Sequence, residues 1–401
     1  MSLLLMLFWG AAALIVYTYI LFPALVFLRG WLLPRPYAAA EITPRVSMII
    51  AAYNEAGSIE AKLNNILSLD YPRDRLEVLV ASDGSNDGTD AIVRGYAKHG
   101  VKLLSLPRQG KASALNAAVA ASTGEILVFS DANSMYAPDA IRALVRPFAD
   151  PEVGGVAGNQ RYLSEGNAGI SSDGERSYWR FDRKLKQFQS QAGNVISATG
   201  AIYAIRRSLF QTIPEGVTDD FVTSTRVIAK GYRLVFAPGA VAYESVAKSG
   251  GVEFGRKVRV ISRGLRGVLV TRELLNPLRY GFYALQLLSH KVSRRLVVFP
   301  LLVLLLVSPL LWQQGRFYQV ATLAQVGFYG CAVLGMLLGG TPLGRLKIFA
   351  FPFYFCMVNT AALLATVNVL RGHHIVLWEP QRQDASVERT IAPTISESRS
   401  A

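Results

Sequence analysis

Val46-Ser-Met-Ile-Ile-Ala-Ala52 decides the fold, together with two later apolar runs, Leu76-Glu-Val-Leu-Val-Ala81 and Glu125-Ile-Leu-Val-Phe-Ser130. Each run is short and rich in Val, Ile or Leu, which is typical of a buried strand. Between and around them, apolar spacing and turn residues predict helices at 59–69, 90–99 and 112–121 and a strand at 101–106. Because strands alternate with helices, the sequence predicts an α/β domain with a mainly parallel sheet covered on both faces.

Polar residues follow three of these strands directly. Tyr53-Asn54-Glu55 comes after the first, Asp83 ends the second, and Asp131-Ala132-Asn133 comes after Ser130. Each cluster by itself is also ordinary turn chemistry. In parallel sheets, however, ligands bind beyond the carboxyl ends of the strands. Three such clusters on one sheet therefore predict a binding site at this edge.

The composition separates this domain from the rest of the chain. Of 401 residues, 51% are hydrophobic and 17% are charged, yet the formal net charge is +14. A soluble domain usually carries about 25% charged residues, and a disordered basic protein would be far less apolar. Two cysteines are too few for a disulfide scaffold. The sequence therefore predicts apolar and basic segments that are separated along the chain.

Four uncharged apolar segments, 3–28, 296–313, 319–340 and 348–370, predict membrane-spanning helices. The first is too long for a signal peptide and lacks its basic start and its small-residue cleavage pattern, so we expect an anchor. The predicted organisation is a transmembrane helix at 1–30, a globular domain at 43–245, basic amphipathic interface helices at 246–295, three transmembrane helices at 296–370 and a polar, disordered tail at 371–401.

Basic residues lie beside the predicted spans. Arg29 and Arg35 follow the first span, and Lys291 and Arg294 precede the second. The positive-inside rule then predicts that the globular domain is cytoplasmic. We expect a multi-pass protein of the inner (plasma) membrane with its N-terminus outside.

The segment between Lys248 and Arg295 is strongly basic, with eleven Lys and Arg against two Glu. Four of its arginines share one helix face: Arg256, Arg259, Arg263 and Arg266. A basic amphipathic helix beside membrane spans predicts attraction to anionic lipids. Because the charges lie so close to the spans, we do not expect nucleic-acid binding.

Six motifs, in order, make the chain resemble membrane-integrated family 2 glycosyltransferases of the GT-A fold, the group containing hyaluronan, chitin, cellulose and poly-N-acetylglucosamine synthases. The resemblance covers roughly residues 46–270. The motifs are Ala51-Ala-Tyr-Asn-Glu55, Ala81-Ser-Asp-Gly-Ser-Asn-Asp-Gly-Thr89, Gln109-Gly-Lys-Ala-Ser-Ala-Leu-Asn116, Ser130-Asp-Ala-Asn133, Ala198-Thr-Gly-Ala-Ile-Tyr203 and Thr218-Asp-Asp220.

The resemblance implies how a nucleotide sugar would be held. Asp131 and Asn133 stand where the family has Asp-x-Asp, which implies a bound Mg or Mn ion beside the sugar diphosphate. Asn133 keeps an oxygen ligand but lacks the charge of aspartate. The residues implied in binding the UDP-sugar are Ala52, Tyr53, Glu55, Asp83, Lys111, Asp131 and Arg263.

The resemblance also implies the catalytic groups. Asp220 corresponds to the general base of an inverting transfer, and Asp219 holds it or shares its titration. The same two acids also suit a helix N-terminus. Thr199 and Gly200 are expected to line the acceptor site, where Gly200 allows close backbone approach.

The predicted activity is glycan extension from a UDP-sugar at the cytoplasmic membrane face, with an oligomer or an export partner as a further expectation because four spans are few. Val260-Ile-Ser-Arg263-Gly264 keeps only the Arg of the family's Gln-x-x-Arg-Trp. This departure motivates a first alternative, single transfer to a lipid acceptor of the ceramide or lipid-phosphate type. Asn133 motivates a second, an inactive membrane component that binds a nucleotide or a glycan.

Overall fold

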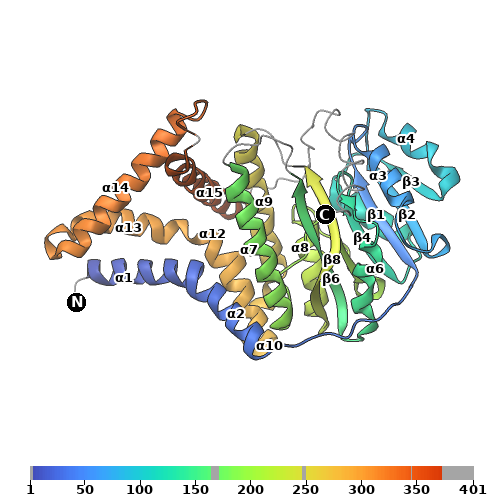
Figure 1. Ribbon diagram of the computed structural model, residues 1–401, viewed down its shortest axis with the longest axis horizontal. Coiled ribbons are helices and arrows are strands. Elements are labelled where there is room, and N and C mark those ends of the chain that lie inside the picture. The colour runs from blue at the N-terminus through green and yellow to red at the C-terminus, as the bar shows by residue number, and fades with distance from the viewer. Residues whose placement is uncertain (1–2, 164–170, 246–249, 345, 373–401) are drawn as a thin grey trace, which may run out of the picture.

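The computed structural model describes residues 3–163, 171–245, 250–344 and 346–372. It contains a sheet with helices on both faces and an arm of long apolar helices (Figure 1). Helices α7 (Ser171–Gln191) and α9 (Gly250–Val270) stand between the two parts (Figure 1). The predicted disordered tail at 371–401 lies outside the described residues from 373 onward.

Eight strands form one mixed sheet in the order β3-β2-β1-β4-β7-β6-β8-β5. The first four in this order are mutually parallel, and neighbouring strand ends align, as Ala51 does with Asp131. This parallel half was predicted and is confirmed. The strands are β1 (Val46–Ala52), β2 (Leu76–Asp83), β3 (Val101–Leu106), β4 (Ile126–Asp131), β5 (Met135–Tyr136), β6 (Val153–Leu163), β7 (Tyr203–Arg206) and β8 (Arg233–Ser245).

The other half of the sheet changes direction. Strand β7 runs antiparallel to both β4 and β6, whereas β8 runs parallel to β6 and antiparallel to β5. No strand of this half was predicted from the sequence. Strand β7 has only four residues and β5 only two, so neither offers a pattern long enough to recognise.

Strand β1 shows why the sheet needs helices on both faces, because all seven of its residues are buried. Met48 and Ile50 belong to one apolar cluster, and Ile49 and Ala51 belong to another. The first cluster includes residues of α3 and α6, and the second includes residues of α5 and α8. The helices are α3 (Ile59–Leu67), α4 (Thr89–Gly95), α5 (Lys111–Ala121), α6 (Ala140–Val145) and α8 (Asp219–Ala229).

The three predicted helices of this half form, with one change at an end. The helix predicted at 90–99 is divided into α4 and a 3-10 turn at Ala97–His99. Ser58 stands at the N-cap of α3, but it makes no capping hydrogen bond. Its hydroxyl instead donates to Glu55 Oε2 at 2.7 Å, because that buried carboxylate competes for it.

Three helical segments are long and apolar enough to cross a membrane: Leu3–Leu32, Arg316–Leu337 and Lys347–Leu370. The first comprises α1 (Leu3–Val16), a π-helical turn and α2 (Phe22–Leu32); the others are α14 and α15. A bent pair, Phe282–Leu296 and Val298–Leu310, gives a fourth candidate with a 49° bend. The structure therefore contains three candidate spans, or four if the bent pair is one span, in agreement with the prediction of about four.

The span predicted at 296–313 corresponds to a shorter helix in the structure. Helix α13 covers only Val298–Leu310, and 13 residues reach only about 20 Å, less than the roughly 30 Å of a bilayer core. The missing length comes from the preceding arm of the bent pair, which contains α11 (Phe282–Gln286), a π-helical turn at Leu287–Ser293 and α12 (Arg294–Leu296). The remaining short helix is α10 (Pro277–Tyr280).

Helix α9 lies between the sheet domain and the apolar arm. Its Val258 is buried with Ala361 and Ala365 of α15. Arg263, expected on a shared basic face, is itself only 8% exposed. Its Nε donates to the carbonyl oxygen of Val217 at 2.9 Å. This arginine therefore points into the globular domain and not toward lipid, because α9 is covered on both sides.

Candidate active site

Strand order brings the predicted acidic clusters together. Strand β1 lies between β2 and β4, so the residues after β1 lie between Asp83 and Asp131. Asp131 is the last residue of β4 and Asp83 the last of β2. The shared edge at the carboxyl ends of these strands is the candidate site.

Lys111 connects this edge to the second acidic motif. It is the first residue of α5, and its Nζ lies 2.7 Å from Asp131 Oδ1 and 3.2 Å from Asp219 Oδ2. Burial alone would lower the pKa of Lys111, but the carboxylates of Asp131 and Asp219 raise it. Lys111 therefore stays charged and holds the two motifs, which are far apart in sequence, at one point.

Asp219 and Asp220 form the first turn of α8, where the helix dipole favours negative charge. Burial would raise the pKa of Asp219, but Lys111 and Arg263 lower it below the usual value. Asp220 behaves in the opposite way, because burial and then repulsion from Asp219 raise its pKa to about 6. One acid is thus held ionised, and its neighbour gains and loses a proton close to neutral pH.

Asp83 is 2% exposed and its oxygens are already hydrogen-bonded. Arg108 Nη1 lies 2.5 Å from Oδ2, and the backbone N–H groups of Gln109 and Gly110 donate at 2.7 to 2.9 Å. The Arg108 guanidinium also lies 3.3 Å from the centre of the Tyr53 ring. Asp83 thus fixes the loop before Lys111. A direct contact of Asp83 or Tyr53 with the UDP-sugar stays a prediction.

Arg108 is a site residue that the sequence reasoning missed. It directly precedes the Gln109-Gly110-Lys111 motif, between β3 and α5. A basic residue at the carboxyl end of a parallel strand was the available signal.

Glu55 stands beside the same edge. Burial raises its pKa to about 7, the Ser58 hydroxyl opposes that rise, and the negative charges of Asp131 and Asp87 add to it. Ala52, the last residue of β1, is fully buried below it.

Gly200 lies close against the side chain of Asp131. A Cβ atom at this position would lie 2.8 Å from Asp131 Oδ2, closer than real Cβ contacts allow. The neighbouring Thr199 has a buried hydroxyl without a hydrogen-bond partner. The Ala198–Tyr203 motif, which was predicted to line the acceptor site, therefore lies directly against the Asp131 carboxylate.

A second layer behind Asp131 was also missed. Lys62 is fully buried, donates to the carbonyl oxygen of Ser134 and lies 4.0 Å from the centre of the Tyr136 ring. Ser134 in turn donates to Glu244. Burial lowers the pKa of Lys62 to about 7 although Asp131 and Glu244 oppose this. Lys62 lies on α3 and Glu244 near the end of β8, and these segments meet only in the folded chain. The spacing of the residues in the sequence therefore gave no signal for this cluster.

The oxygen donors fit a divalent cation that substrate phosphates would complete. Asp131 offers a carboxylate, and Asn133, two residues on, is half-buried and carries an amide oxygen. Among the described residues, no group of three or more His, Cys, Asp or Glu could hold a metal by itself. Negative charge is nevertheless concentrated here, because Asp131 contributes to raising the pKa of both Glu55 and Glu244. Mg²⁺ commonly binds through one or two protein oxygens and substrate phosphates.

Comparison with known proteins agrees with this geometry. Residues 47–213 match the model of glycosyl transferase family 2. A poly-beta-1,6-N-acetyl-D-glucosamine synthase of Staphylococcus epidermidis is 26% identical over 221 residues, 53% of each chain. A probable glycosyltransferase, YdaM of Bacillus subtilis, is 27% identical over 232 residues, 54% of each. These alignments span about half the length of the relatives.

One solved structure extends the likeness to almost the whole chain. Mannosyltransferase PcManGT from Pyrobaculum calidifontis, in complex with GDP-Man and Mn²⁺, has a TM-score of 0.68 and 27% sequence identity. The match covers 92% of this chain and 100% of that one. The expected GT-A fold is therefore confirmed.

Proposed function

Because residues 47–213 form a glycosyl transferase family 2 domain, we propose that this protein transfers a sugar from a UDP-sugar to a hydroxyl group of a growing glycan. The transfer inverts the anomeric carbon and takes place at the cytoplasmic face of the inner (plasma) membrane. Lys111, which joins Asp131 to the acidic pair of α8, carries this proposal. In this proposal Asp131 lies beside the diphosphate and Asp220 acts as the base, and Lys111 holds the two motifs close enough to act on the same sugar.

Asp131 and Asn133 would hold the divalent cation. A bound Mg²⁺ or Mn²⁺ supplies positive charge to the diphosphate as it leaves. Lys111 adds a fixed cation on the same side, 2.7 Å from Asp131 Oδ1. Preorganised charge of this kind stabilises a leaving group at little cost in reorganisation.

Asp220 accepts the proton of the acceptor hydroxyl. A base works best when its pKa lies near the working pH, and a pKa of about 6 meets that condition. Asp219 is a positioning residue, because its carboxylate is bound to Lys111 at 3.2 Å. The buried hydroxyl of Thr199, which has no hydrogen-bond partner, supports a role for this residue in binding the acceptor.

A single transfer to a lipid acceptor is the second candidate. In processive relatives, as the motif resemblance implies, a Trp follows the Arg that Arg263 matches. Here Gly264 follows, and even a Cβ atom at this position would lie 2.5 Å from the Arg295 guanidinium. A bulky ring at this position would displace the Arg295 side chain, which favours a shorter product.

The test is release of nucleoside diphosphate from a panel of UDP-sugars and GDP-mannose, with and without Mg²⁺ or Mn²⁺, followed by mass analysis of the product. A polymer formed from a UDP-sugar supports glycan extension, and one sugar on a lipid supports the second candidate. Turnover with GDP-mannose alone would contradict the UDP assignment. Binding of a donor without turnover of any would support a non-catalytic component.

A further inference from the structure

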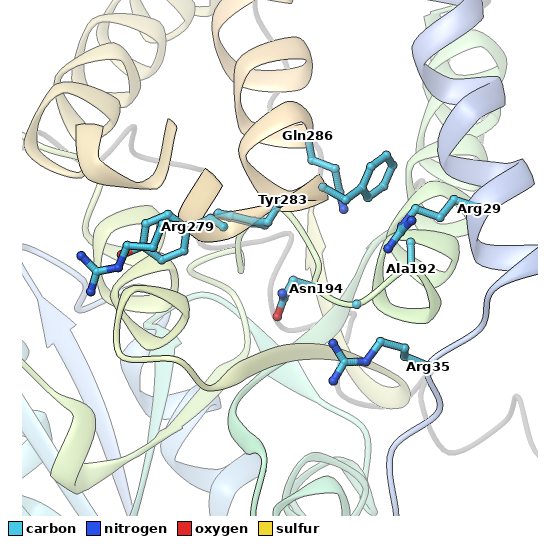
Figure 2. Close-up of a pocket in the computed structure, with 11 residues that line it drawn as sticks. Arg29, Arg35, Ala192, Asn194, Arg279, Tyr283 and Gln286 are labelled. Carbon is cyan, nitrogen blue, oxygen red and sulfur yellow. The ribbon is translucent and has the colours of Figure 1, made fainter. Parts of the chain in front are cut away.

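A second polar cavity lies away from the candidate active site. It has a volume of about 320 Å³ and is formed by the end of α2, the loop after α7 and the segment around α10 and α11. Figure 2 shows this arrangement. It shares no residue with the cluster of Lys111, Asp131 and Asp219.

The lining of this cavity is basic. Arg29, Arg35 and Arg279 contribute to it, and no acidic side chain does among the described residues. Figure 2 shows Arg29 and Arg35 reaching from the N-terminal segment toward the loop that carries Asn194. The Arg29 guanidinium lies 4.6 Å from the centre of the Phe282 ring. Arg35 is 3.3 Å from Glu152, in an ion pair whose side chains are both more than half exposed. Such a pair is weak and exchanges readily.

Two buried polar atoms in the lining have no hydrogen-bond partner. One is Arg29 Nε, and the other is Oε1 of Gln286, a residue that is only 1% exposed. Buried polar groups are rarely left unpaired in native proteins. A half-turn of the Gln286 amide would present its N–H groups instead. Both residues therefore offer donors to a group with several acceptor oxygens.

The cavity lies at the end of a candidate membrane span. Arg29 is in the last turn of α2, at the end of a 30-residue apolar helix. Trp31, two residues on, is 72% exposed. Tryptophan and arginine at the end of a span are typical of the headgroup level.

We propose that this cavity binds the phosphate group of an anionic molecule at the membrane surface, with Arg29, Arg35 and Gln286 as its donors. Arginine suits this ligand because its planar fork binds phosphate oxygens in pairs. The group belongs either to a phospholipid headgroup or to a free phosphate. Binding here joins the first apolar helix to the globular domain and to α11.

The test uses the purified full-length chain in neutral detergent. Native mass spectrometry measures binding of phosphatidylglycerol, with phosphatidylcholine as the uncharged comparison. The double variant Arg29→Gln/Arg35→Gln should bind phosphatidylglycerol at least about tenfold more weakly than the wild type. Arg272→Gln is the control, because Arg272 is an exposed arginine of the basic segment that also contains Arg279, but it does not line the cavity. It should bind like the wild type.

A parallel titration with inorganic phosphate separates the two sources. Thermal stabilisation by phosphate in the wild type but not in the double variant identifies a free phosphate, whereas lipid binding alone identifies a headgroup. Equal lipid binding by the wild type and the double variant, with no response to phosphate, would overturn the proposal. So would an equal loss in Arg272→Gln, which would indicate general surface attraction. If the double variant does not fold, Gln286→Leu, which keeps every charge, must weaken binding of the same probe.

Discussion

Replacing Asp220 with Asn should abolish sugar transfer and stabilise the folded protein above pH 6. The first effect follows if Asp220 is the base, because an amide cannot accept the proton. The second follows from the environment of the carboxylate, which is buried beside the negative charge of Asp219. Asn has almost the same shape and needs no charge in that place.

The size of the stabilisation follows from the pKa. Burial and Asp219 raise the pKa of Asp220 to about 6, against an ordinary value of 3.8. A difference of about 2 corresponds to about 3 kcal/mol of unfolding free energy at pH 7 to 8. A raised pKa favours the folded state below 3.8 and opposes it progressively as the pH rises to 6. The gain from Asp220→Asn should therefore be largest at pH 8 and should vanish near pH 4.

The assay is the midpoint of thermal unfolding in detergent from pH 4 to pH 8, combined with release of nucleoside diphosphate. We expect a midpoint several degrees higher than the wild type at pH 8 and a loss of turnover at every pH. The wild-type turnover should rise as the pH passes upward through about 6. Asp219→Asn is the control, because it removes the partner of Lys111 and should lower the midpoint. Full turnover in Asp220→Asn would refute the catalytic role. A midpoint difference that does not change with pH would refute the argument from burial.

Three further outcomes test the rest of the site. Lys111→Met leaves two carboxylates without their cation and should destabilise the protein by about 3 kcal/mol or more, measured by chemical unfolding of the detergent-solubilised chain; a change below 1 kcal/mol would contradict the contact. Gly200→Ala places a Cβ atom 2.8 Å from Asp131 Oδ2 and should reduce turnover by about a hundredfold; Gly239→Ala, where the nearest atom is 3.6 Å away, should keep wild-type turnover. Removal of divalent ions with EDTA should stop turnover, and added Mn²⁺ or Mg²⁺ should restore it. Turnover that persists in EDTA would show that the enzyme with Asn133 at this position does not need a divalent cation.

The parallel half of the domain could be predicted from local sequence because its signals are local. An uninterrupted run such as Val46–Ala52 is buried on both faces and needs no distant partner to be recognised. The positions of Asp83 and Asp131 could be predicted for the same reason. A residue at the carboxyl end of a parallel strand lies at the ligand-binding edge of the sheet, whatever the order of the strands.

The other half depends on contacts between distant segments. Strand β7 is too short to give a pattern, and its place between β4 and β6 is set by packing. The bend that divides Phe282–Leu310 was also not predicted. Pro300 was the available signal, because proline has no backbone N–H to donate to the carbonyl group of residue 296, where the two arms meet. Arg263 was predicted to lie on a basic helix face, but it is buried because α9 packs between the globular domain and the apolar arm.

The sequence by itself determined the kind of chain this is: apolar helices and an α/β domain with acidic residues at its strand ends, of which residues 47–213 match the model of glycosyl transferase family 2. Tertiary structure alone decided the electrostatic environment of those acids. Asp219 and Asp220 are adjacent and chemically identical, and the motif resemblance assigned them different roles without a physical reason for the difference. Lys111 reaches only the first, so the pKa of Asp219 is lowered while that of Asp220 is raised to about 6. The electrostatic interaction depends on distance and burial, and these are properties of the folded chain.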